Sequence, residues 1–107
     1  MQPILHGDVD LLPIDKLPKD LKKISHNGQY VLRHGESGHR HVIVAERPDQ
    51  IEILLDEATG LHYLNVKSAV EITHEEHKTL VIEPGFWQEK SETEYNPFEK
   101  QLKKVVD

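Results

Sequence analysis

Hydrophobic and polar residues alternate along most of the chain with a period of two, the pattern of a β-strand with one buried face. The alternating stretches are short, rich in β-branched and aromatic residues, and separated by turn residues. We expect strands at residues 9–14, 29–34, 39–45, 50–56, 61–66, 69–73, 79–83 and 85–90. The pattern therefore predicts a single all-β domain over residues 1–107, either a small β-barrel or a sandwich.

Turn and capping residues predict how these strands are connected. Glycines in the segments 35–38 and 57–60 favour two hairpin turns, because glycine adopts the positive φ that tight turns require. Pro18 suits the first position of a short helix over 18–24. Asn96 and the proline after it resemble the start of a second helix, over 96–105, although that segment also fits an edge strand.

Composition narrows the range of functions. Thirteen Lys and Arg against nineteen Asp and Glu give a net charge of −6, which argues against a nucleic-acid partner. The absence of cysteine excludes disulfides, thiolate nucleophiles and Cys-ligated metal sites. The mean hydropathy is −0.59, and no apolar run approaches the roughly 18 residues needed to cross a bilayer. We expect a cytoplasmic protein with no membrane partner.

Eight histidines are an unusually large number for 107 residues. Three of them, His34, His39 and His41, flank the predicted 35–38 turn, and alternation places His39 and His41 on the same face of a strand. A four-residue loop sets the register of this hairpin. The expected cross-strand pairs are His34 with His39, Leu32 with His41 and Tyr30 with Ile43.

A second cluster, His74-Glu75-Glu76-His77, falls between two predicted strands, where side chains of a turn can project together. Imidazole and carboxylate groups suit a divalent transition metal such as zinc, iron, nickel, copper or manganese. An open coordination position would allow such an ion to bind a small molecule or activate water. We therefore expect metal ligands among His39, His41, His74 and His77, with His34 and Glu46 as further candidates, and Glu75 or Glu76 as a general base.

The remaining histidines, His6, His26 and His62, are expected to be structural polar residues. A non-catalytic alternative extends this interpretation to the whole set, in a self-associating structural or interaction protein. Protonation of all eight histidines would change the net charge from −6 to −6 + 8 = +2 near pH 6.5, so assembly would respond to acid. Whether the protein is an enzyme stays open, and a homo-oligomer is expected in either case.

The motifs resemble those of a group of small proteins from bacteria and their phages. These motifs are the segments 35–41, 73–77, 84–87, 94–97 and 105–107, so the resemblance spans almost the whole chain. That group has no established activity, so the resemblance implies relatives without implying a function.

A second and partial resemblance is to cupins, small β-barrels whose first motif contains His-x-His and a glutamate. His39, His41 and Glu46 match that inner spacing, and His74 or His77 would take the place of the later cupin histidine. The flanking glycines are displaced, and Phe86 and the residue after it stand where the second motif has a histidine. The resemblance implies a cupin-like barrel that binds a metal ion.

Overall fold

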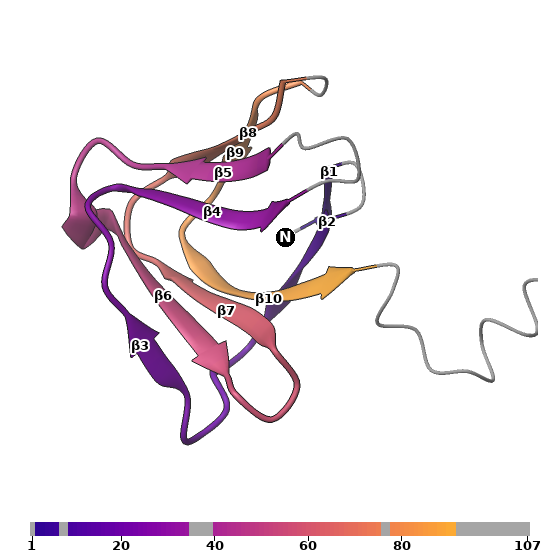
Figure 1. Cartoon of the computed structure of the whole chain (residues 1–107), viewed down its shortest axis with the longest axis vertical. Helices are drawn as coiled ribbons and strands as arrows, with labels where there is room; N and C mark the ends of the chain where they lie inside the picture. Colours follow the sequence, from indigo (N-terminus) through magenta and orange to yellow (C-terminus); the bar gives the residue numbers. More distant parts are fainter. Residues whose placement is uncertain (1, 7–8, 35–39, 76–77, 92–107) are drawn as a thin grey trace, which may run out of the picture.

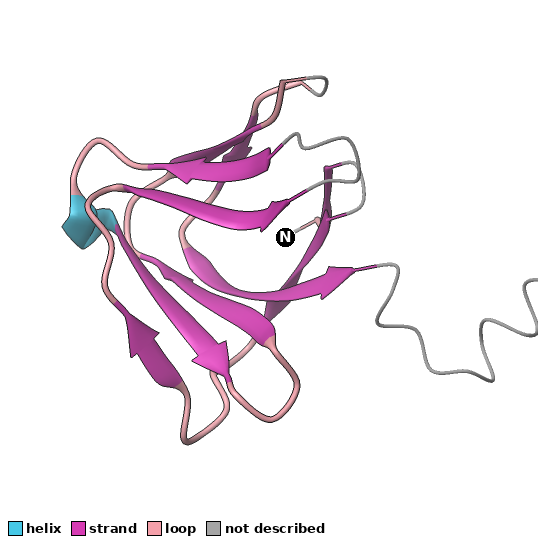
Figure 2. Ribbon diagram, in the orientation of Figure 1, coloured by secondary structure: helices cyan, strands magenta, loops and turns pink. Residues whose placement is uncertain are grey.

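The protein folds into two antiparallel β-sheets packed face to face (Figures 1 and 2). The computed structural model describes residues 2–6, 9–34, 40–75 and 78–91. The six-stranded sheet has the order β1-β2-β10-β7-β6-β3, and the four-stranded sheet has the order β4-β5-β8-β9. Within the described residues no ladder joins the two sheets, so of the two expected architectures the fold is the sandwich and not a closed barrel.

The ten strands and one short 3-10 helix cover most of the described chain. They are β1 Ile4–His6, β2 Val9–Ile14, β3 Lys22–Ile24, β4 Gln29–His34, β5 Arg40–Val44, η1 Pro48–Gln50, β6 Ile51–Asp56, β7 Leu61–Val66, β8 Val70–Thr73, β9 Leu80–Ile82 and β10 Gly85–Ser91. All eight expected strands form, with boundaries within one residue of the prediction. In the described residues no helix is long and apolar enough to cross a membrane.

Alternate residues of each strand point between the sheets and form the hydrophobic core. On β6 these residues are Ile51 and Ile53, and on β7 they are Leu64 and Val66. Trp87 on β10 is 1% exposed and donates its indole N–H to the carbonyl of Glu83 at 2.9 Å. The core also contains Val9, Leu11, Leu32, Ile43, Val70, Ile72 and Ile82.

The pairing of β4 with β5 differs from the expected hairpin register. Tyr30 lies opposite Ile43 as predicted, but the ladder shifts between Val31 and Arg33. Arg33 therefore lies opposite His41, and Arg40 lies opposite His34, so the expected pairs of His41 with Leu32 and of His34 with His39 are wrong. The cause is one extra residue on β4, a β-bulge that periodicity alone does not reveal. The turn 35–38 and His39 lie outside the described residues.

Two short edge strands were not expected. The segment 18–24, predicted as a helix, instead contains β3, which pairs with β6, and β1 pairs with β2. Asp20 has a φ of 65°, a left-handed conformation that interrupts a helix. A seven-residue helix is marginal in water, and the free edge of β6 offers hydrogen bonds that stabilise the extended alternative. The helix expected at 96–105 lies outside the described residues.

The turn at 57–60 confirms the second hairpin prediction. It joins β6 to β7, which pair from Ile51 with Val66 to Asp56 with Leu61. Gly60 has a φ of 77°, and its N–H donates to the carbonyl of Asp56 at 2.7 Å. Glycine suits this position because it adopts a positive φ without steric cost.

Candidate functional site

Two of the predicted site histidines meet at one end of the sandwich. His41 lies near the start of β5, and His74 follows the last residue of β8. Their ring centroids are 4.4 Å apart, with an angle of 40° between the ring planes. His41 is 1% exposed, and His74 is partly exposed. The two imidazoles therefore lie against each other, with one ring buried and the other reaching the surface.

The pairing of β5 with β8 explains this contact. Val42 lies opposite Thr73, and in an antiparallel pair the next residues along, His41 and His74, then also face each other. Beyond them the backbone N–H of Arg40 donates to Oε2 of Glu75 at 3.1 Å. His41 alternates with the core residue Ile43, so its ring points between the sheets. The sheet register thus joins two segments that are distant in the sequence.

The geometry of this pair is compatible with one shared ion. A transition metal lies about 2.0–2.1 Å from each coordinating imidazole nitrogen, so a shared ion requires two neighbouring rings, and these two rings are neighbours. Among the described residues no group of three or more His, Asp or Glu side chains is arranged to hold a metal ion. Among these residues, His41 and His74 are the predicted ligands whose rings meet.

The other predicted site residues are spread over both ends of the sheet or are not described. His39, Glu76 and His77 lie outside the described residues. The backbone of His34 ends β4 opposite Arg40, at the same end of the molecule as His41. Glu46 lies beyond the other end of β5, in an exposed position. Five residues of extended chain span about 16 Å, so Glu46 does not reach the His41–His74 pair.

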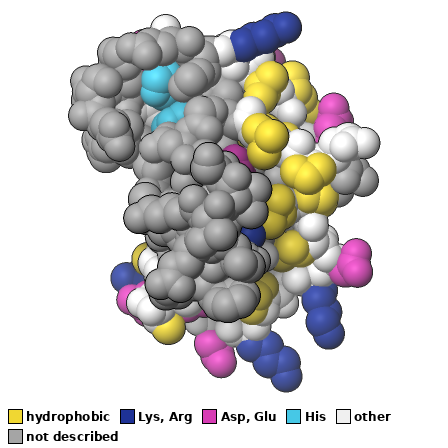
Figure 3. Space-filling model, turned by 90° about the vertical axis from the view of Figure 1, so that its right-hand side faces the viewer, with side chains coloured by type: hydrophobic (Ala, Val, Ile, Leu, Met, Phe, Trp, Pro, Cys, Tyr) yellow, Lys and Arg dark blue, Asp and Glu magenta, His cyan; other side chains and the backbone are white. Residues whose placement is uncertain are grey.

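Glu75, the described member of the predicted pair of general bases, lies beside the histidines. Its side chain is exposed and is held by the backbone N–H of Arg40. A carboxylate in this position is able to accept a proton from solvent or from a molecule bound near His74. Figure 3 shows one side of the molecule, on which histidine side chains are visible and hydrophobic side chains gather.

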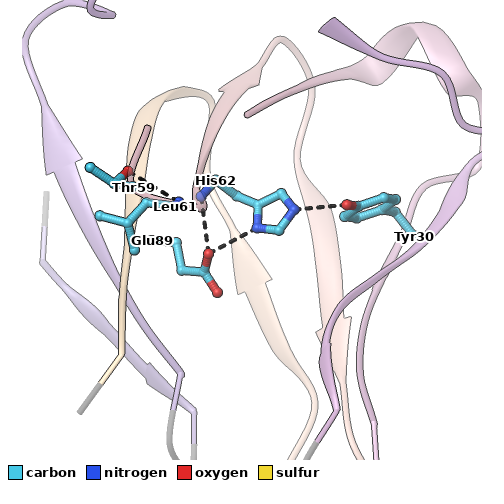
Figure 4. Close-up of polar contacts among 5 residues, drawn as sticks. All are labelled: Tyr30, Thr59, Leu61, His62 and Glu89. Atoms are coloured by element: carbon cyan, nitrogen blue, oxygen red, sulfur yellow. Dashed lines mark hydrogen bonds and ion pairs between the residues drawn. The ribbon is translucent and has the colours of Figure 1, made fainter. Parts of the chain in front are cut away.

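A second polar cluster, which the sequence analysis did not predict, connects the two sheets (Figure 4). His62 lies on β7, Glu89 on the neighbouring β10, and Tyr30 on β4 of the opposite sheet. The Nδ1 of His62 is 2.9 Å from Oε1 of Glu89, and its Nε2 is 2.7 Å from the hydroxyl of Tyr30. We call this cluster the Tyr30–His62–Glu89 bridge.

The bridge has a defined direction of hydrogen bonding. Oε1 of Glu89 also accepts the backbone N–H of His62 at 3.0 Å, and a carboxylate only accepts hydrogen bonds. We therefore assign the proton of neutral His62 to Nδ1, which leaves Nε2 to accept the hydroxyl of Tyr30. The Glu89 side chain is 1% exposed and that of His62 is 13% exposed, so the bridge is largely shielded from water.

Burial also affects the tyrosine of the bridge. Loss of hydration raises the pKa of Tyr30, and the negative charge of Glu89 raises this pKa further. A phenol with a raised pKa stays protonated at neutral pH and is a poor nucleophile. The bridge links β7 and β10 of one sheet to β4 of the other through side-chain hydrogen bonds.

Strand alternation contained a signal for the bridge. His62 lies two residues before the core residue Leu64, and Glu89 lies two residues after Trp87. Each therefore occupies an inward position that normally holds an apolar side chain. A buried polar residue requires a partner, so these positions predict hydrogen bonding. Which residues pair depends on the packing of the two sheets, and no local pattern specifies it.

His26 has a structural role of a different kind. Its Nε2 is 2.9 Å from the carbonyl oxygen of Ile51, and its Nδ1 accepts the backbone N–H of Gly28 at 3.1 Å. Both ring nitrogens thus contact backbone groups, and they hold the segment before β4 against the start of β6. The expectation that His26 and His62 are structural agrees with these contacts.

Comparison with known proteins places the chain in one family. Residues 5–91 match the family model DUF8820, described as a domain of unknown function, and the chain belongs to this family. No curated protein matches the chain. No solved structure matches it either. These comparisons give no support to the resemblance to cupins or to an association with phages.

Proposed function

Since membership of DUF8820 assigns no activity, we propose a function from the side chains themselves. The protein binds a divalent transition metal at the end of the sandwich, with His41 and His74 as two of the ligands. The observation that supports this proposal is the 4.4 Å separation of their rings, which come from two distant segments of the chain. Neutral imidazole is a ligand for zinc, iron, nickel and copper and also occurs in manganese sites.

Further ligands come from the residues next to this pair in the sequence. Stable protein sites for such metals use three or four protein ligands. His39 precedes His41 by two residues and His77 follows His74 by three, so their proximity in the sequence makes them candidates for the same ion, and His34 is a further candidate. Glu46 is left out of this proposal, because it lies at the other end of β5.

An exchangeable position on the ion would give the site its chemistry. The metal would bind a small molecule or polarise a water molecule, and Glu75 or Glu76 would accept a proton. Glu75 supports this role by its position, since it is exposed and next to His74. The proposed function is therefore metal-dependent binding or conversion of a small molecule.

Elemental analysis of the protein tests the proposal most directly. The chain is purified without an affinity tag, and its bound metal is measured after dialysis against trace amounts of zinc, iron, nickel, copper and manganese. We expect about one ion per chain in the wild type, and loss of that ion in His41→Ala and His74→Ala. Glu46→Ala is the matched control and should keep its metal. Absence of stoichiometric metal from the wild type contradicts the proposal.

A second candidate function is supported by the other histidines. His26 and His62 use both ring nitrogens in contacts within the chain, which is the behaviour expected of structural histidines. In this interpretation the protein is a non-catalytic, self-associating module, and its assembly responds to histidine protonation. Light scattering from pH 5 to 8 tests it, and a constant monomer over that range contradicts it.

A further inference from the structure

The outer face of the four-stranded sheet carries valines at positions that usually hold polar residues. Val42 and Val44 point outward from β5, between inward-facing residues such as Ile43. Val81 on β9 is 50% exposed. When one face of an antiparallel sheet is solvated, its outward positions are normally polar. This face therefore carries apolar residues at outward positions, of which Val81 is exposed and Val42 and Val44 are partly exposed.

Two shallow depressions on this face meet along β5. One is lined by Val44, Glu46, Glu71 and Val81, among others. The other is lined by Arg40, Val42, Val44, His74 and Glu75, among others. Because Val44 lines both, the two depressions adjoin at this residue, and together we call them the β5 groove. Its lining includes Val42, Val44 and Val81 together with charged side chains.

The charge on the rim indicates which kind of partner fits. Glu46, Glu71 and Glu75 line the groove, and Arg40 is the one cationic residue among its described lining. The whole chain carries a net charge of −6. In a second copy the same groove carries the same excess of carboxylates, so two grooves that face each other would repel. A partner with positive charges is electrostatically complementary.

We propose that the β5 groove binds a basic, apolar peptide segment of a partner protein. Alternate apolar side chains of the segment would contact Val42, Val44 and Val81, and its Lys or Arg side chains would lie near Glu46 and Glu71. The five residues of β5 extend over about 17 Å, the length of five extended peptide residues. Apolar contact contributes affinity, and the carboxylates contribute orientation and rate of association.

Binding of a labelled decapeptide of alternating Val and Lys, measured by fluorescence anisotropy at low salt, tests this surface on the full chain. We expect binding that weakens with added salt, and no binding of the corresponding Val and Glu peptide. The double variant Glu46→Lys/Glu71→Lys should bind the basic peptide about tenfold more weakly. Val81→Ser should weaken binding by about threefold, since half of that side chain is already exposed.

The double variant Asp15→Lys/Glu57→Lys is the matched control, because it changes the net charge by as much as Glu46→Lys/Glu71→Lys does. Asp15 is exposed after β2, and Glu57 is 70% exposed in the turn between β6 and β7. It should bind the basic peptide with nearly wild-type affinity. Equal weakening by the control and by Glu46→Lys/Glu71→Lys overturns the proposal, because attraction would then depend on net charge alone. A wild-type dimer in sedimentation that dissociates in Glu46→Lys/Glu71→Lys also overturns it, since a second copy would then occupy the groove. The proposal does not depend on metal binding.

Discussion

The His41–His74 pair and the Tyr30–His62–Glu89 bridge both contain histidine, but the imidazole rings in the two clusters have different neighbours. In the bridge, both nitrogens of His62 contact oxygen atoms, one of a carboxylate and one of a phenol. In the pair, one imidazole lies against another. Both His41 and His62 are mostly buried, so burial alone does not distinguish a structural histidine from a candidate ligand. The two kinds of histidine are distinguished by the chemistry of the groups next to the imidazole.

The two regions also differ in what they connect. The bridge joins β7 and β10 of one sheet to β4 of the other, so it links the two layers of the sandwich. The pair joins β5 and β8, which are neighbours in one sheet and are already held by backbone hydrogen bonds. Changes in the bridge should therefore affect stability, whereas changes in the pair should affect metal binding.

The largest expected effect is on the bridge. His62→Ala leaves the carboxylate of Glu89 buried without its imidazole partner, and removal of one member of a buried ionic or hydrogen-bonded pair costs about 3–5 kcal/mol. Urea denaturation with a folded-state check by circular dichroism measures the change. The double variant His62→Leu/Glu89→Leu should recover part of the loss, because no buried charge remains. A loss below about 1 kcal/mol would show that the bridge is solvated.

The next effect concerns the pair. If His41 and His74 bind zinc, the ion at 100 times its Kd should stabilise the wild type by about 2.7 kcal/mol, and chelator should remove this gain. His74→Ala should show no such gain, whereas Tyr30→Phe should keep it. Thermal unfolding with and without zinc measures both. A similar zinc effect in His74→Ala would assign the metal to other residues.

Tyr30→Phe removes the hydrogen bond to Nε2 of His62 and keeps the aromatic ring in place. The ring contacts His62 edge-on, with centroids 5.4 Å apart, so most of the packing should survive. We expect a loss of about 0.5–1.5 kcal/mol, the usual net contribution of one hydrogen bond. Denaturant unfolding at pH 7 measures it. A loss as large as that of His62→Ala would mean that the phenol, rather than Glu89, anchors the bridge.

Alkaline pH should weaken the fold through the same tyrosine. Burial and Glu89 raise the pKa of Tyr30, so the folded state favours the neutral phenol. The contribution of Tyr30 to stability is complete below pH 10, where the tyrosine of the unfolded state is still protonated. It is lost as the pH rises through the pKa that Tyr30 has in the folded state. Tyr30→Phe should make stability less dependent on pH above 10. Tyr63 should retain a dependence of the same sign, since burial and the charge of Asp56 raise its pKa as well.

The smallest effect on stability is expected for a surface ion pair, which serves as an exposed comparison for the buried bridge. Nζ of Lys23 is 3.1 Å from Oε2 of Glu52, and this contact, followed by the amide of Asn65, lowers the pKa of Glu52. Because the pKa of Glu52 is lowered in the folded state, the ion pair stabilises the fold at pH values above the pKa of an unfolded glutamate. This stabilisation disappears as the pH falls through the pKa that Glu52 has in the folded state. Lys23→Ala should cost at most about 0.5 kcal/mol at pH 7. Urea unfolding at pH 7 and pH 3 measures the loss of stability in Lys23→Ala. A larger loss at pH 3 than at pH 7 would contradict the prediction.

The candidate site was predicted in part. His41 and His74 could be proposed from histidine clustering, and the structure places their rings in contact. The partners of His62 could not be proposed, because Tyr30, His62 and Glu89 belong to strands far apart in the sequence. The distance between Glu46 and His41 was likewise not apparent, since a short sequence separation in an extended strand is a long separation in space.

Alternation along the chain determined the strands, the all-β class and the inward-facing positions, because the two-residue period of a strand is a local property of the backbone. The tertiary structure determined the bulge in β4, the edge strand β3 in place of a helix, and the arrangement of ten strands in two sheets. These features depend on hydrogen bonds and contacts between distant segments, whose free energies outweigh local preference only once the sheets pack together.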